Sequence, residues 1–133
     1  MSENLVYLSS VWAEEVLKRL QAALPPEKMN NVSTSMSNIY KNCPGGGEKY
    51  LYIQCDNGAV TKVETGTGEP PKAEFAITGE YETFAKISRA ELGSQRALMT
   101  GKLKLKGNMA RALKLASLAD RMNKIISGVP AVY

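Results

Sequence analysis

The stretch that decides the fold runs from Met99 to Ala116 and reads "MTGKLKLKGNMARALKLA". Lysine and leucine alternate between two glycines, and apolar residues with helical spacing follow. Alternation places the lysines on one face of a strand and the leucines on the other. A strand with one basic and one apolar side, joined to a basic amphipathic helix, suits three roles. It could bind nucleic acid, lie on a membrane surface, or form one wall of a container for an apolar guest.

Length and composition predict a single globular domain over residues 1–133. The chain is 44% hydrophobic and 23% charged, which is ordinary for a globular protein. No run of about 18 apolar residues occurs, and the first residues lack the basic start and apolar core of a signal peptide. We therefore expect a cytoplasmic location.

The chain contains no histidine and two cysteines, Cys43 and Cys55. Histidine is the commonest general base near neutral pH, so its absence excludes Ser-His-Asp and Cys-His catalysis and argues against the usual zinc ligand sets. We expect both cysteines to be buried thiols. We expect no catalytic residues, no bound metal and no cofactor.

Positive charge is concentrated at the C-terminal end, where seven basic residues from residue 101 onward stand against Asp120 alone. Nucleic-acid binding would require aromatic stacking groups among them, and residues 101–131 contain none. We therefore expect no nucleic-acid partner. Lys102, Lys104 and Lys106 are interpreted as a solvated strand face, with transient contact to an anionic membrane surface as the alternative.

Periodicity and turn residues predict an α+β fold with one mainly antiparallel sheet covered on one face by helices. The expected order is a helix over residues 11–24, strands over 30–43, 50–55, 59–65 and 73–79, helical segments over 80–92 and 94–101, a strand over 102–106, and a final helix. Ser10 is expected to cap the first helix and Asn108 the last, which we expect to break near Ser117.

The strands show which side chains face inward. "YLYIQC" puts Leu51, Ile53 and Cys55 on one face, and "DNG" at residues 56–58 predicts a hairpin after it. Methionine can line a space that fits more than one guest, although core filling is its commoner use. Four methionines are expected to point inward: Met36, Met99, Met109 and Met122.

The order of these motifs is similar to that of a known family. "LMTGKLKLKGNMARALKL", preceded by "FAITGEYETFAKI", closely resembles the SCP2-type sterol carrier domain family. The matching residues are Thr100, Gly101 and Lys102, the alternating strand 103–106, and the Gly-Asn-Met triplet at 107–109. The resemblance extends from the first helix to about Ala119, and a stand-alone prokaryotic-like member is expected.

The resemblance implies a five-stranded sheet whose helices enclose an apolar tunnel. Such domains hold fatty acyl chains, acyl-CoA, phospholipids or sterols and perform no chemistry of their own. The expected ligand-binding residues are Met36, Leu51, Ile53, Phe75, Ile77, Phe84, Ile87, Leu98, Met99, Leu103, Leu105, Met109, Leu113, Leu118 and Met122. Lys102, Arg111 and Lys114 are expected to contact the lipid head group at the mouth.

Two further roles stay open at this point. The chain could be a regulatory or substrate-presenting module that partners a lipid-metabolising enzyme, or an enzyme that uses Lys or Glu as its base. A homodimer is also compatible with the sequence. If the container hypothesis is right, the purified protein should carry lipid from its expression host, and replacing Leu105 or Leu113 by Glu should abolish binding of a fluorescent fatty acid.

Overall fold

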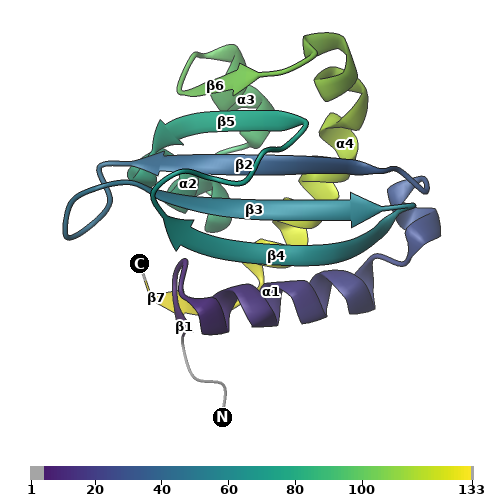
Figure 1. Ribbon diagram of the computed structural model, residues 1–133, viewed down its shortest axis with the longest axis horizontal. Coiled ribbons are helices and arrows are strands. Elements are labelled where there is room, and N and C mark those ends of the chain that lie inside the picture. The colour runs from purple at the N-terminus through teal and green to yellow at the C-terminus, as the bar shows by residue number, and fades with distance from the viewer. Residues whose placement is uncertain (1–4, 133) are drawn as a thin grey trace.

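A five-stranded sheet forms the centre of the computed structural model, which describes residues 5–132 (Figure 1). The strands are β2 (Thr34–Lys41), β3 (Lys49–Asp56), β4 (Ala59–Thr67), β5 (Phe75–Glu80) and β6 (Leu103–Lys106). They lie in the order β4-β3-β2-β5-β6, and each neighbouring pair is antiparallel except β2 and β5, which are parallel. The α+β class and the mainly antiparallel five-stranded sheet are confirmed.

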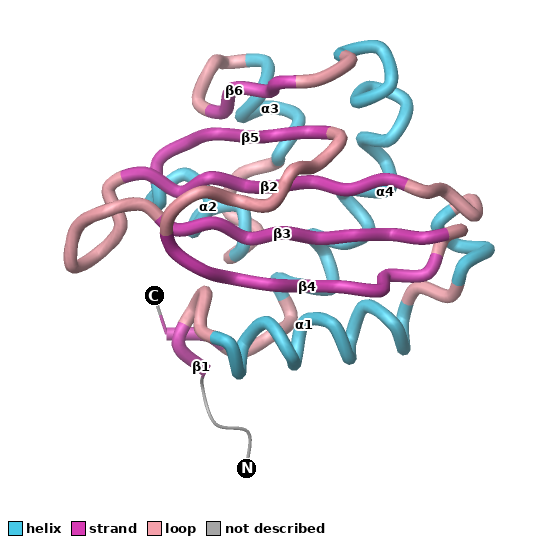
Figure 2. The backbone as a smooth tube through the Cα atoms, in the orientation of Figure 1, coloured by secondary structure: helices cyan, strands magenta, loops and turns pink. Residues whose placement is uncertain are grey.

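Helices gather behind one face of this sheet, as Figures 1 and 2 show. They are α2 (Tyr81–Ser88), α3 (Ser94–Met99) and the long α4 (Met109–Ser127). Helix α1 (Ser10–Ala23) lies along the β4 edge, and a short 3₁₀ turn, η1 (Pro26–Met29), follows it. No helix within residues 5–132 combines the length and the apolar character needed to cross a membrane.

The opposite face of the central strand is covered by the β4–β5 connection, which crosses in front of the sheet in Figure 1. Ser37, only 1% exposed, points toward this connection and donates a hydrogen bond from its hydroxyl to the Pro71 carbonyl at 2.9 Å. Because side chains alternate along a strand, the neighbours of Ser37 point toward the helices instead. The inward face of β2 therefore carries Met36, Asn38 and Tyr40.

Two turns depend on residues with positive φ angles. Asn57 and Gly58 have φ angles of +50° and +88°, which forms the expected hairpin between β3 and β4. Gly107, between β6 and α4, has φ of +136°, and a Cβ there would lie 2.8 Å from the Phe75 ring. Asn108 then caps α4, since its Oδ1 accepts the Arg111 backbone N–H at 3.1 Å.

The structure corrects two details of the helices. Ser9, rather than Ser10, caps α1: its Oγ accepts the Trp12 backbone N–H at 3.2 Å, which places Ser10 inside the first turn. Helix α4 continues without a break through Ser117. Ser117 is exposed, so its hydroxyl remains solvated and does not interrupt the helix.

The two ends of the described chain also pair. Strands β1 (Leu5–Val6) and β7 (Ala131–Val132) run parallel, an arrangement that two-residue segments are too short to predict. Cys43 and Cys55 are both buried and free, as expected.

Candidate functional site

The floor of a cavity is formed by side chains that the strand register aligns in rows across the sheet. Asn38 pairs with Leu51 on one side and Ile77 on the other, and Ile77 pairs with Leu105. These four positions form one row across β3, β2, β5 and β6. A second row contains Ile53, Met36 and Phe75.

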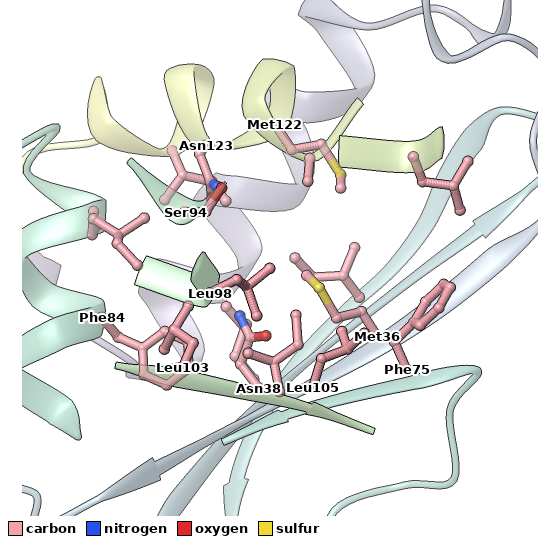
Figure 3. Close-up of a pocket in the computed structure, with 18 of the residues that line it drawn as sticks. Met36, Asn38, Phe75, Phe84, Ser94, Leu98, Leu103, Leu105, Met122 and Asn123 are labelled. Carbon is pink, nitrogen blue, oxygen red and sulfur yellow. The ribbon is translucent and has the colours of Figure 1, made fainter. Parts of the chain in front are cut away.

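The helices form the roof. Figure 3 shows Met122 and Asn123 of α4 across the cavity from Met36 and Asn38 of the floor. Helix α2 contributes Phe84, Ile87 and Ser88, and α3 contributes Ser94 and Leu98. The other α4 contacts are Ala112, Leu115, Ala119 and Ile126. The space between roof and floor is about 130 Å³.

Gly79 makes room for the packing at one end of the floor. It lies opposite Leu103 in the sheet, and a Cβ at this position would come within 2.5 Å of Leu103 Cδ2 and 3.3 Å of Phe84 Cε2. Any side chain here would therefore displace two residues that line the cavity.

Aromatic residues close the end of the cavity that faces α1. Tyr7 lies edge-on to Trp12, with ring centroids 4.9 Å apart, and its hydroxyl is 3.3 Å from that of Tyr40. Trp12 is fully buried. Edge-to-face packing of this kind contributes about 0.5–1.5 kcal/mol per pair beyond area burial.

The chemistry of the lining is apolar and uncharged. Among the described residues that line the cavity, none carries a charge, and the polar ones are hydroxyl, thiol, indole and amide side chains. Burial of apolar surface, worth about 0.8 kcal/mol per methylene, is the interaction that such walls offer. The arrangement suits an apolar guest, and the described walls contain no carboxylate, amine or guanidinium group.

Two polar atoms of the lining are unpaired. Within residues 5–132, the buried side-chain nitrogen and oxygen atoms without a hydrogen-bond partner are Trp12 Nε1 and Asn38 Oδ1. Both residues line the cavity. Leaving such groups unpaired is unfavourable in the ligand-free protein.

The family profile of the SCP-2 sterol transfer family matches residues 10–120, which cover the sheet and most of the cavity. The chain belongs to this family. The crystal structure of sterol carrier protein 2 matches with a TM-score of 0.83 at 22% identity, covering 92% of this chain and 98% of that chain. A conserved hypothetical protein of Thermus thermophilus gives a TM-score of 0.81 at 21% identity, covering 98% of this chain and 94% of that chain.

A curated relative is much longer than this chain. Hydroxysteroid dehydrogenase-like protein 2 of Homo sapiens is 38% identical over 79 residues, which is 59% of this chain and 18% of that protein. The chain thus corresponds to less than a fifth of that relative.

The SCP-2 family fold brings together most of the residues that the sequence nominated. Those that line the cavity are Met36, Leu51, Ile53, Phe75, Ile77, Phe84, Ile87, Leu98, Leu103, Leu105 and Met122. Leu103 and Leu105 face inward from β6, while Lys104 and Lys106 are exposed on its other side. Their contact with a ligand stays a prediction.

Four nominated residues lie elsewhere. Met99, Met109 and Leu113 are 87%, 52% and 66% exposed, so the expectation that they point inward is wrong. Leu118 is buried in the core but does not line the cavity.

On α4, the sequence pattern assigned the wrong side of the helix to the cavity. Its cavity face follows residues 112, 115, 119, 122 and 126, a spacing of three and four. Leu113 and Leu115 differ by two positions, about 200° around the helix, so only one of them can face the sheet. Met99 is the last residue of α3, and its side chain turns outward there.

The expected head-group residues do not gather at one mouth. Lys102 precedes Leu103, which pairs with Gly79 near the end of β5. Arg111 lies at the opposite end of β5, where it forms an ion pair with Glu74 and donates to the Ser33 carbonyl at 3.0 Å. Lys114 is exposed on α4, and none of the three basic residues lines the cavity.

Several residues that line the cavity were not predicted, although the spacing of residues in the sequence indicates that they face inward. Trp12 follows the helical spacing of the buried Val16 and Leu20. Asn38 alternates with Met36 and Tyr40, so period two places it inward despite its polarity. Cys55 also lines the cavity, and burial raises the pKa of its thiol, to which the nearby Asp56 carboxylate adds.

Proposed function

We propose that this protein holds the apolar part of a lipid in the cavity and transfers the lipid without altering it chemically. Membership of the SCP-2 sterol transfer family supports lipid binding and transfer. The observation that carries the proposal is the lining, which is apolar over both sheet and helices and contains no charged side chain among its described residues.

Burial of methylene groups accounts for the affinity. A chain of ten methylenes gains roughly 8 kcal/mol before the cost of association is subtracted, and micromolar binding requires about 8 kcal/mol after that subtraction, so the tighter guests should have longer chains. One methylene more or less changes binding by only about 1–3 kcal/mol. We therefore propose several acceptable guests: a fatty acyl chain, acyl-CoA, a phospholipid or a sterol-like lipid.

Lipid extraction from the purified protein tests this proposal. We expect organic extraction and mass spectrometry to recover lipid from the expression host in near-stoichiometric amount. The delipidated protein should then move a fluorescent lipid between donor and acceptor vesicles. A stable protein that is purified empty and binds no added lipid would refute the proposal.

We further propose that the start of α4 docks on an anionic membrane when lipid is exchanged. Met109 and Leu113 lie one turn apart and are 52% and 66% exposed, and Lys106 and Lys114 are exposed beside them. Each basic residue near an anionic leaflet contributes on the order of 1 kcal/mol, and exposed apolar side chains enter the interface.

Vesicle binding distinguishes this surface from the rest of the molecule. Replacing both Met109 and Leu113 by Ser should weaken sedimentation with phosphatidylserine vesicles and slow lipid transfer. The control is Val11→Ser, because Val11 is similarly exposed, at 56%, on α1. Equal binding by both variants, or no preference for phosphatidylserine over phosphatidylcholine, would exclude this docking surface.

The length of the curated relative favours a second candidate, a lipid-presenting module for an enzyme. The matching segment makes up 18% of human hydroxysteroid dehydrogenase-like protein 2, so a related segment occurs within a much longer protein. Transfer between vesicles by the isolated chain supports the carrier. Dependence on an added catalytic partner, recovered by pull-down from the native host, supports the module.

A further inference from the structure

An amide side chain occupies the middle of the cavity floor. Asn38 lies on β2, the central strand of the five, and pairs with Leu51 and Ile77 in the sheet. Its neighbours along the inward face are Met36 and Tyr40. Figure 3 shows the Asn38 amide among Leu98, Leu105 and Met36. A polar group is therefore held where each adjacent position of the sheet offers an aliphatic or aromatic side chain.

The oxygen of this amide lacks a partner among residues 5–132. Asn38 Oδ1 is buried and accepts no hydrogen bond, whereas most buried polar groups in proteins are paired. A guest that fills the cavity with hydrocarbon alone would leave the oxygen unpaired. A guest with a donor at this depth would satisfy it.

The chemical class of that donor follows from the groups available. An asparagine amide accepts through its oxygen and donates through its nitrogen, and a hydroxyl can do both. The unpaired atom is Oδ1, so the guest must supply a donor, and a hydroxyl group does so. An ionised carboxylate only accepts, and no cation among the described lining residues would compensate its burial.

We propose that Asn38 is a specificity-determining residue that selects lipids carrying an uncharged hydroxyl group inside the cavity. This inference rests on the proposed lipid-binding function and narrows it. Ethers, hydrocarbons and ionised fatty acids of the same length would bind more weakly, because none of them donates a hydrogen bond to Oδ1.

Matched ligands and matched variants test the role of Asn38. The delipidated protein is loaded with the neutral fluorescent probe N-phenyl-1-naphthylamine, which is then displaced by dodecan-1-ol, dodecyl methyl ether or dodecanoate at pH 7. One additional hydrogen bond contributes about 0.5–1.5 kcal/mol, so we expect the alcohol to bind roughly 3–10-fold more tightly than the ether. Asn38→Leu should remove this preference by weakening alcohol binding.

Gln54→Leu is the matched control. It removes an amide from the neighbouring strand β3, but Gln54 does not line the cavity and its amide is bonded to Asp56 and Tyr52. This variant should keep the preference for the alcohol. Each variant is used only if its circular dichroism matches that of the parent protein.

The outcomes separate this inference from the proposed function. If neither the probe nor any ligand binds, lipid binding itself is refuted. If all three ligands bind equally to the parent protein, the cavity binds lipid but Asn38 selects nothing. If Asn38→Leu does not fold, the side-chain NH₂ resonances of Asn38 are followed in the parent protein by nuclear magnetic resonance. They should shift on addition of the alcohol and not of the ether, and equal shifts would overturn the inference.

Discussion

Asn38 shows at the scale of one residue how a binding site costs stability. Its buried oxygen has no partner in the part of the chain that the structure describes, and an unpaired buried polar group costs about 1–3 kcal/mol on mutational scales. We expect Asn38→Leu, whose side chain has the same number of heavy atoms and the same branching, to raise the free energy of unfolding of the lipid-free protein by about 1 kcal/mol in urea titrations. Gln54→Leu should lower it, because that change breaks hydrogen bonds. A less stable Asn38→Leu protein would mean that internal water already pairs the amide.

Ionisation of the Cys55 thiol should make the free energy of unfolding depend on pH. Burial raises the pKa of Cys55 in the folded protein, and burial raises that of Cys43 in the same direction. An unfolded cysteine loses its proton near about pH 8.5, so the stability contributed by each thiol is fully present below that pH and falls as the pH rises toward the raised pKa. Between about pH 7.5 and 9.5, Cys55→Val should lose less unfolding free energy than the parent protein. Parallel curves for the two proteins would contradict the assignment.

Helix α4 shows what periodicity can and cannot predict at the scale of an element. The alternation in β6 and in β3 predicted their inward faces correctly, because one strand face contains leucine, isoleucine or cysteine and the other contains lysine, tyrosine or glutamine. On α4 the sequence offers apolar residues at both Leu113 and Leu115. Packing against the sheet decides between them, and this information lies in other segments of the chain.

Two charged substitutions on α4 test which side of this helix faces the cavity. Leu115→Glu would place a carboxylate in the uncharged cavity, and we expect affinity for N-phenyl-1-naphthylamine to fall more than about tenfold. Leu113→Glu would place the same charge in solvent and leave affinity unchanged. If Leu115→Glu does not fold, Leu115→Ser replaces it, with the same expected direction. Loss of binding in Leu113→Glu alone would show that the side of α4 first predicted from the sequence faces the cavity.

At the scale of the whole molecule, the cavity is a property of no single element. Its walls come from β2, β3, β5 and β6, from α2, α3 and α4, and from Tyr7 and Trp12 near the N-terminus. Local patterns predicted the layers and 11 of the lining side chains. They could not predict that the layers leave space, because a void depends on how side chains from distant segments interlock.

Removing lipid should therefore destabilise the protein. An empty space of about 130 Å³, at about 24 cal/mol per Å³, corresponds to about 3 kcal/mol. A ligand at one hundred times its Kd contributes about 2.7 kcal/mol to the folded state. We expect delipidation to lower the Tm by about 10 °C in calorimetry and reloading with lipid to restore it. A Tm unchanged by both treatments would mean that the cavity has no resident guest.

A larger side chain inside the cavity should raise the stability of the protein and weaken ligand binding. Ala119 lines the cavity from α4, so Ala119→Leu would place three additional carbon atoms there and occupy part of the room intended for a guest. We expect the lipid-free Tm to rise by several degrees, because buried methylenes contribute about 0.8 kcal/mol each, while the affinity for N-phenyl-1-naphthylamine falls. Ala110→Leu is the matched control, since Ala110 lies exposed on the same helix and its replacement should change neither quantity appreciably. Unchanged probe affinity in a stabilised Ala119→Leu protein would show that the guest lies elsewhere. A destabilised variant with full affinity would show that this part of the cavity is already too closely packed to admit either lipid or leucine.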